Sequence, residues 1–139
     1  MFSKLLVATD GSDNALRAAR QAIQLVRKLP AKATLISVAY VPTMYRDDIG
    51  AELNESFLND ARQALRFTEK VFTEEQQSCD TKLVQDLHPA DAILEEAKAG
   101  NYDLIVLGSR GLSEREVKRL GSVSQEVVQR AQCSVLLVR

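Results

Sequence analysis

The chain contains few of the residues that build a metal centre or a cross-linked scaffold. It has two cysteines, Cys79 and Cys133, and one histidine, His88. Two widely separated cysteines favour reduced, structural thiols over a disulfide framework. Together with a single histidine they also supply too few ligands for a zinc site. His88 directly precedes a proline, which favours a loop or surface position over a catalytic one.

The sequence also lacks an excess of charge of either sign and any long apolar run. Its 18 basic and 19 acidic residues give a formal net charge of −1, which argues against nucleic-acid binding through bulk positive charge. No apolar stretch approaches the ~20 residues of a membrane span, and residues 1–9 lack the pattern of a signal peptide. We therefore expect a cytoplasmic protein without a nucleic-acid or membrane partner.

Predicted strands and helices alternate along the whole chain. Short apolar or β-branched runs predict strands at residues 4–9, 33–41, 103–107 and 134–138, and a weak alternation of apolar and polar residues predicts a further strand at 81–86. Apolar residues at helical spacing predict helices at residues 15–29, 57–72, 89–99 and 123–131, the first capped by Ser12 or Asp13, and residues 43–53 are predicted to form a loop. This order predicts one α/β domain over residues 1–139, with a mostly parallel sheet and helices on both faces.

Three of the six glycines fall within fourteen residues, where Gly108, Gly111 and Gly121 are followed by Ser122. Gly108 ends a predicted strand and Gly121 precedes a predicted helix. Glycine lets a phosphate approach the backbone closely, and N–H groups in a turn or at a helix N-terminus attract anions. In open α/β sheets, ligands bind beyond the carboxyl ends of strands. The pattern therefore predicts a phosphate site; alternatively, the glycines only close a tight loop.

Ser122 and Asp10 each have two roles that the sequence leaves open. Ser122 either caps the last helix, with Gln125 completing a capping box, or donates its hydroxyl to a phosphate oxygen. Asp10 follows the first predicted strand, where a carboxylate would repel phosphate. It suits a ribose hydroxyl or an adenine amino group, or it caps the first helix.

Four segments resemble the universal stress protein family, and the resemblance covers essentially the whole chain. They are VATDGS at 7–12, DLIVLGSRG at 103–111, LGSVS at 120–124 and CSVLLVR at 133–139. The glycine motif is that of the nucleotide-binding branch of the family. The resemblance implies a Rossmann-like open sheet of five parallel strands in the order 3-2-1-4-5. It also implies ATP or AMP as the ligand, with or without Mg²⁺.

The same resemblance assigns contacts to individual residues. Asp10 would meet the ribose or adenine, and Val41 would meet the adenine through its backbone. The phosphates would lie against Gly108, Gly111, Gly121, Ser122 and Val123, and further candidates for the site are Thr9, Ser109, Arg110 and Ser124. No catalytic residue is predicted.

The C-terminal strand is predicted to lie at the sheet edge. Its run of valine and leucine favours pairing with another chain, and the family resemblance implies a homodimer through this strand. A monomer with a protected edge is the alternative.

Three roles fit these features: a nucleotide-binding regulator or sensor in a stress response, a slow ATPase or phosphotransferase, and a dimeric scaffold with an unused pocket. The sequence has no Walker motif, no protein-kinase motifs and no dinucleotide fingerprint after the first strand. Glu114 and Glu116 offer carboxylates for Mg²⁺, but they alternate with basic residues as a solvated face does. Because phosphoryl transfer needs a metal site and a group that positions water, fast hydrolysis is not expected.

Overall fold

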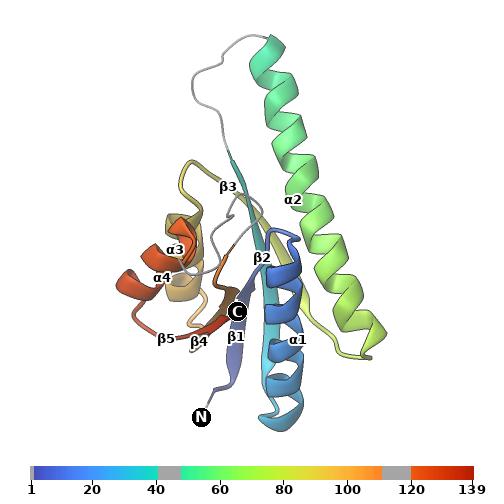
Figure 1. Cartoon of the computed structure of the whole chain (residues 1–139), viewed down its shortest axis with the longest axis vertical. Coiled ribbons are helices and arrows are strands. Elements are labelled where there is room, and N and C mark those ends of the chain that lie inside the picture. Colours follow the sequence, from blue (N-terminus) through green and yellow to red (C-terminus); the bar gives the residue numbers. More distant parts are fainter. Residues whose placement is uncertain (1, 41–47, 111–119) are drawn as a thin grey trace.

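The computed structural model describes residues 2–40, 48–110 and 120–139, and strands and helices alternate along it (Figure 1). The strands are β1 (Lys4–Ala8), β2 (Lys32–Tyr40), β3 (Asp80–Asp86), β4 (Leu104–Gly108) and β5 (Ser134–Val138). The helices are α1 (Asp13–Lys28), α2 (Asp48–Glu74), α3 (Pro89–Ala99) and α4 (Ser122–Arg130).

The five strands form one parallel sheet in the order β3-β2-β1-β4-β5, which confirms the predicted fold. β1 pairs with both β2 and β4, so the chain leaves β1 toward one side of the sheet and later returns on the other side of β1. Helices α1 and α2 cover one face and α3 and α4 cover the other (Figure 1). The carboxyl ends of β1 and β4 therefore lie side by side at the point where the strand order reverses, where open sheets bind ligands.

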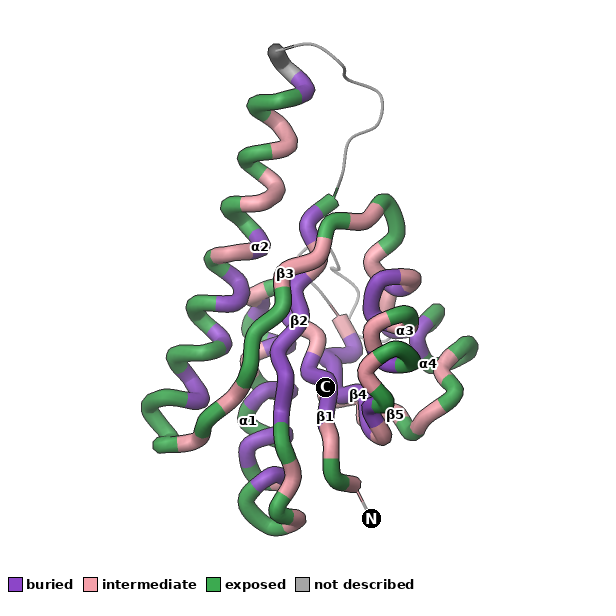
Figure 2. Tube along the Cα trace, turned by 180° about the vertical axis from the view of Figure 1, so that it is seen from behind, coloured by how far each residue is buried: buried purple, intermediate pink, exposed green. Residues whose placement is uncertain are grey.

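The central strands are buried on both faces, because each contributes alternate residues to two cores. Leu5 and Val7 of β1 belong to the core under α1 and α2, whereas Leu6 belongs to the core under α3 and α4. Figure 2 shows this burial concentrated in the middle of the sheet. Double burial explains why these strands are continuous apolar runs in the sequence rather than alternating ones.

The turn from β1 into α1 is fixed by two neighbouring residues. Ser12 is the N-cap, as one of the two predicted alternatives has it, and its Oγ accepts a hydrogen bond of 3.1 Å from the Ala15 N–H. Gly11 has a φ of +80°, and a Cβ there would lie 3.2 Å from the Cα of Ala64 in α2. Only glycine meets both demands without strain, so this turn brings α1 and α2 together.

The predicted loop at 43–53 is wrong for its second half, because α2 begins at Asp48. No residue from Ala51 to Asp60 is buried, and this part of the helix extends beyond the sheet (Figures 1 and 2). It contacts the sheet through an edge-to-face ring contact of Phe57 with Tyr40 and a hydrogen bond between Asn54 and Gln85. Because it buries none of these residues, it has little need for an apolar stripe. The periodicity therefore becomes visible only from Phe57 onward, close to Ala61, the first buried residue of α2 after Gly50.

Both cysteines are free thiols, as predicted. Burial, together with the carboxylates of Glu69 and Asp80, raises the pKa of the Cys79 thiol to about 11. The thiol therefore stays protonated and unreactive at neutral pH. Within the part of the chain that the structure describes, no helix is long and apolar enough to cross a membrane.

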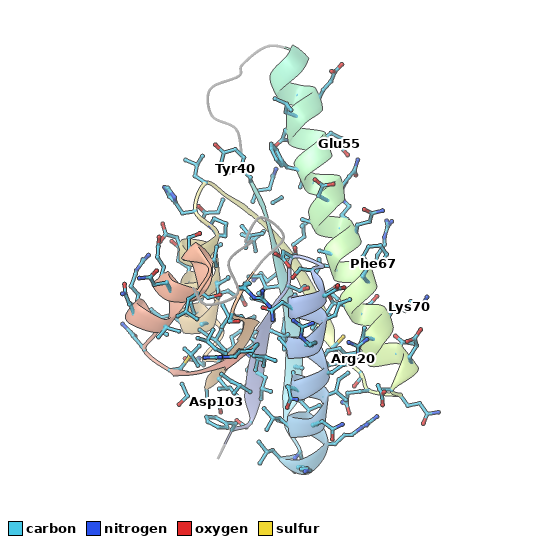
Figure 3. The ribbon with its side chains drawn as sticks, viewed as in Figure 1. Arg20, Tyr40, Glu55, Phe67, Lys70 and Asp103 are labelled. Carbon is cyan, nitrogen blue, oxygen red and sulfur yellow. The ribbon has the colours of Figure 1, made fainter. Side chains whose placement is uncertain are left out.

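Asp103 ties the start of β4 to the N-terminal end of the chain (Figure 3). Its carboxylate accepts hydrogen bonds from Ser3 N–H (2.9 Å), Ser3 Oγ (3.0 Å) and Lys4 N–H (3.0 Å). Partial desolvation alone would raise the pKa of Asp103, but these hydrogen bonds outweigh it, so the pKa lies below its usual value.

Asp103→Asn is expected to lower the urea midpoint of unfolding at pH 7, because the amide cannot accept all three hydrogen bonds. A depressed folded-state pKa stabilises the fold above the unfolded pKa, and this stabilisation is lost as the pH falls through the folded pKa. The gap between variant and wild type should therefore shrink below about pH 4. Asp60→Asn, on the exposed face of α2, is the control, and an equal gap at pH 7 and pH 3 would contradict the prediction.

Candidate functional site

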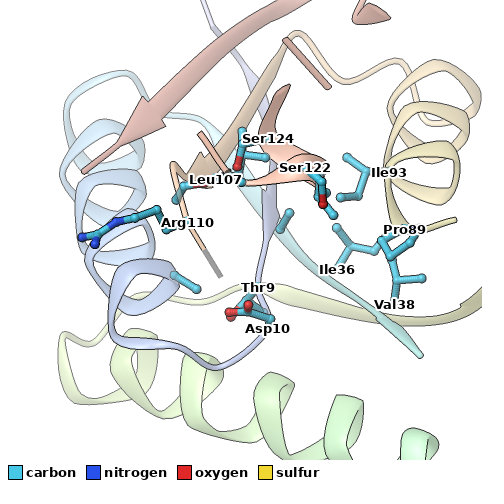
Figure 4. Close-up of a pocket in the computed structure, with 15 residues that line it drawn as sticks. Thr9, Asp10, Ile36, Val38, Pro89, Ile93, Leu107, Arg110, Ser122 and Ser124 are labelled. Atoms are coloured by element: carbon cyan, nitrogen blue, oxygen red, sulfur yellow. Dashed lines mark hydrogen bonds between the residues drawn. The ribbon is translucent and has the colours of Figure 1, made fainter. Parts of the chain in front are cut away.

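A cavity of about 290 Å³ opens where β1 and β4 end (Figure 4). β1, β2 and β4 form its floor, while α3 and α4 form one wall. The lining residues are Ala8, Thr9, Asp10, Ala15, Ile36, Val38, Pro89, Ile93, Leu107, Gly108, Arg110, Gly121, Ser122, Val123 and Ser124. Eight of the predicted site residues are among them, which places residues that are more than a hundred positions apart around one space.

One half of this cavity is apolar. Ile36 and Val38 point up from β2, and Pro89 and Ile93 face them from the first turns of α3 (Figure 4). Sequence reasoning missed these four residues as site residues, because Ile36 and Val38 resemble core residues and Ile93 was assigned to the packed face of its helix. Pro89 did offer a signal. A proline favours the first turn of a helix, and a helix that follows a strand of a parallel sheet begins at the carboxyl ends of the strands, where ligands bind.

The other half is formed by the N-terminus of α4. Gly121, with extended backbone (φ −62°, ψ 156°), is the N-cap, and Gln125 N–H donates the first intrahelical bond to its carbonyl (2.9 Å). The amides of Ser122, Val123 and Ser124 precede that bond, so they have no partner within the helix. They lie at the positive end of the helix dipole, where anions bind.

Of the two roles that the sequence left open for Ser122, the helix cap with its capping box is wrong. Ser122 is the first residue of α4 rather than its cap, and no side chain caps this helix. The helix begins one residue earlier than a serine cap would require, because Gly121 itself takes the extended cap conformation. The Ser122 side chain is exposed and lines the cavity, so its contact with phosphate stays a prediction.

Ser124 and Asp10 have roles in holding the site together. The buried Ser124 hydroxyl donates a bond of 2.7 Å to the carbonyl of Gly108, which joins the first turn of α4 to the end of β4. Asp10 lies across the cavity from Ser122 (Figure 4). Its Oδ1 accepts a bond of 2.9 Å from Ser12 N–H, which shapes the turn that Ser12 then caps.

Thr9 lines the cavity, but its hydroxyl is directed to α2. Its Oγ1 accepts from Gly11 N–H (3.1 Å) and lies 2.7 Å from Oγ1 of Thr68. Thr68 donates its single hydroxyl proton to the carbonyl of Ala64 (2.7 Å), so Thr9 must donate to Thr68. Both hydroxyl groups, of Thr9 and Thr68, therefore have a donor and an acceptor partner. Their hydrogen bonds hold the end of β1 against α2.

Two further predicted residues do not direct their side chains into the cavity. Ser109 is buried and does not line it; its N–H donates to the Val138 carbonyl (2.8 Å) and its own carbonyl accepts from Gly121 N–H (2.7 Å). The Arg110 side chain points away from Ser122 and Asp10 (Figure 4).

Some predicted positions lie outside the described residues, namely Val41, Gly111, Glu114 and Glu116. Across residues 2–40, 48–110 and 120–139, no group of three or more His, Cys, Asp or Glu residues lies close enough to hold a metal ion.

Comparison with known protein families identifies the family of this chain. The model of the universal stress protein family matches residues 1–139. The chain belongs to the universal stress protein family. It is 40% identical to a universal stress protein of Thermus aquaticus and 33% identical to universal stress protein YxiE of Bacillus subtilis, in both cases over 100% of each chain.

Solved structures of universal stress proteins share the fold. UspA from Lactobacillus plantarum matches with a TM-score of 0.85 and 27% identity over 99% of this chain and 98% of that one. A universal stress protein in complex with cAMP matches with a TM-score of 0.76 and 27% identity, covering 99% and 97%. Structures of related proteins with dAMP, from Archaeoglobus fulgidus, and with AMP, from Arabidopsis thaliana, are 20% and 22% identical and show the shared fold alone.

In this universal stress protein, Thr68→Val is expected to lower the free energy of unfolding, because it breaks the hydrogen bonds that connect Thr9, Thr68 and Ala64. Valine keeps the shape of threonine but leaves the Thr9 hydroxyl without its acceptor, and Thr68 is fully buried. Leaving a buried donor unpaired costs about 1–3 kcal/mol, which urea unfolding measures. Thr73→Val is the matched control, since Thr73 makes the same type of bond to Glu69 on the exposed side of α2. Equal losses in the two variants would contradict the prediction.

Proposed function

We propose that this universal stress protein binds an adenine nucleotide, ATP or AMP, in the cavity between β1 and β4 and acts as a cytoplasmic regulator or sensor in a stress response. The observation that carries the proposal is the division of the cavity into an apolar half and a half lined by helix amides. A nucleotide has the same division, with a flat apolar base at one end and anionic phosphates at the other.

The adenine is placed in the apolar half. Ile36 and Val38 offer a surface on one side and Pro89 and Ile93 on the other. Binding sites for small molecules are commonly lined in this way, with a few polar groups that fix the orientation. Asp10 lies beside this half, where its carboxylate suits a ribose hydroxyl.

The phosphates are placed against the N-terminus of α4. The amides of Ser122, Val123 and Ser124 supply donors, and the Ser122 hydroxyl adds one more within the cavity. Hydrogen bonds to a charged group are worth about 1.5–3 kcal/mol each. Four of them give about 6–12 kcal/mol before the cost of immobilising the ligand, and burial of the adenine in the apolar half adds to this toward the ~8 kcal/mol of micromolar binding.

The test is to denature the purified protein and identify any released nucleotide by chromatography, followed by calorimetric titration of the nucleotide-free protein with AMP, ATP and adenosine. We expect recovered adenylate and tighter binding of AMP than of adenosine. Absence of nucleotide in the protein together with no heat of AMP binding would overturn the proposal and favour the scaffold with an unused pocket.

Magnesium and hydrolysis are tested with the same material. Titration with ATP in the presence of Mg²⁺ and of EDTA shows whether the ion takes part, and release of phosphate from ATP over hours measures hydrolysis. We expect binding without appreciable turnover. Sustained release of phosphate would contradict the role as a regulator without turnover and favour a slow ATPase.

A homodimer through β5 is the second part of the proposal. β5 is the edge strand next to β4, and Val135, Leu136, Leu137 and Val138 are only half-buried. An apolar edge with unpaired backbone groups favours pairing with another chain. Sedimentation at micromolar concentration should give twice the mass of the chain, whereas the mass of one chain would refute the dimer.

A further inference from the structure

Asn14, the second residue of α1, is a buried polar residue beside the site that the sequence did not single out. Its side chain is only 5% exposed, and it does not line the cavity. A polar side chain buried this deeply needs hydrogen-bond partners, and the identity of the two partners indicates what Asn14 does.

The two arms of its carboxamide hold two different segments. Oδ1 accepts a bond of 2.7 Å from Arg110 N–H, just after β4, and Nδ2 donates a bond of 3.2 Å to the carbonyl of Val138, at the end of β5. One arm therefore accepts and the other donates. A carboxylate of the same size would place an oxygen against the Val138 carbonyl, and an aliphatic side chain would satisfy neither partner.

The Val138 carbonyl is shared by a second bond that leads to the phosphate half of the cavity. Ser109 N–H donates to it (2.8 Å), and the Ser109 carbonyl accepts from Gly121 N–H (2.7 Å), the N-cap of α4. Asn14 thus stands at the start of a short network that connects the end of β5, the first residues after β4 and the cap of the anion-binding helix.

The position of Gly108 shows how closely Asn14 approaches the end of β4. A Cβ at Gly108 would lie 2.2 Å from Asn14 Oδ1 and 2.8 Å from its Cγ. The first glycine of the motif therefore makes room for this side chain as well as for a ligand. Asn14 packs directly against the backbone from which the glycine motif starts.

We propose that Asn14 is a positioning residue for the phosphate group of the nucleotide. It holds the backbone of Arg110 and, through Val138 and Ser109, the cap of α4, so that the start of the glycine motif and the helix amides face the same point. This inference rests on the proposed function. It predicts a selective effect, because adenosine has no phosphate and makes no use of this alignment.

The experiment compares AMP and adenosine binding by calorimetry in Asn14→Leu, which keeps the shape of asparagine and removes both hydrogen bonds. We expect AMP affinity to fall by about tenfold or more and adenosine affinity to change by less than about threefold. Asn54→Leu is the matched control, since Asn54 Oδ1 accepts a bond from Gln85 that joins α2 to β3 (3.0 Å). It should leave the preference for AMP unchanged.

The outcomes separate the inference from the function on which it rests. A purely structural role of Asn14 would lower both affinities in parallel or neither, and either result would overturn the inference alone. Failure of the wild-type protein to bind AMP would overturn the proposed function and the inference with it. If Asn14→Leu does not fold, Asn14→Ala provides the same comparison with a smaller side chain.

Discussion

Replacing Gly121 with valine is expected to abolish AMP binding and leave the fold intact. Gly121 is buried and lines the cavity at the N-cap of α4, so an isopropyl group there takes up space where the phosphate would lie. Its φ of −62° and ψ of 156° are open to any residue, which is why the backbone should tolerate the change. Losing two hydrogen bonds to a charged group weakens binding by about a hundredfold or more.

Calorimetry measures the loss of AMP binding, and circular dichroism with urea unfolding reports the fold. Gln125→Val is the matched control, because it places the same β-branched residue one turn further along α4, where the side chain is exposed and does not line the cavity. Unchanged AMP affinity in Gly121→Val would mean that the phosphate binds elsewhere. An unfolded variant would instead show that Gly121 is a structural residue.

Replacing Gly108 with alanine is expected to destabilise the fold by about 1–3 kcal/mol, the usual cost of overpacking a buried position. The added Cβ would lie 2.2 Å from Asn14 Oδ1 and 3.1 Å from the backbone carbonyl carbon of Asn14. Asn14 cannot swing aside freely, because Arg110 N–H and the Val138 carbonyl hold its two arms. The added methyl group must therefore break bonds or push α1 away from the sheet.

A double-mutant cycle identifies the cause of that loss. Asn14→Ala removes the closest atoms, so Gly108→Ala should cost less in the Asn14→Ala background than in the wild type, as expected for residues in contact. Urea unfolding of the four proteins provides the comparison. Additive costs would show that the clash with the Asn14 side chain is not what destabilises Gly108→Ala.

The parts of the fold that could be predicted are those in which a local pattern and the burial of a residue agree. The strands β1 and β4 are buried on both faces, so their apolar runs were recognisable without knowledge of their neighbours. The start of α2 was not predictable, because no residue from Ala51 to Asp60 is buried, so burial does not impose a helical period on this stretch.

The site was predictable where it depends on backbone chemistry. Gly108 and Gly121 are unusual residues in a short window, and a helix follows them directly. Ile36, Val38 and Asn14 escaped prediction for the opposite reason: their roles depend on what the sheet order places beside them. Ile36 and Val38 look like any core residue along the chain, and Asn14 contacts Arg110 and Val138, which lie 96 and 124 positions away.

The two edges of the sheet differ in chemistry. β3 exposes Asp80, Lys82 and other polar residues along its edge, whereas the β5 edge is a run of valine and leucine. Charged side chains hinder strand pairing and apolar ones favour it. Pairing through β5 would therefore join the apolar edges of the two copies. The polar β3 edge of each copy would remain at the outside of the assembly, where its charged side chains hinder further pairing. Such an assembly would therefore close at two copies and would not grow into filaments.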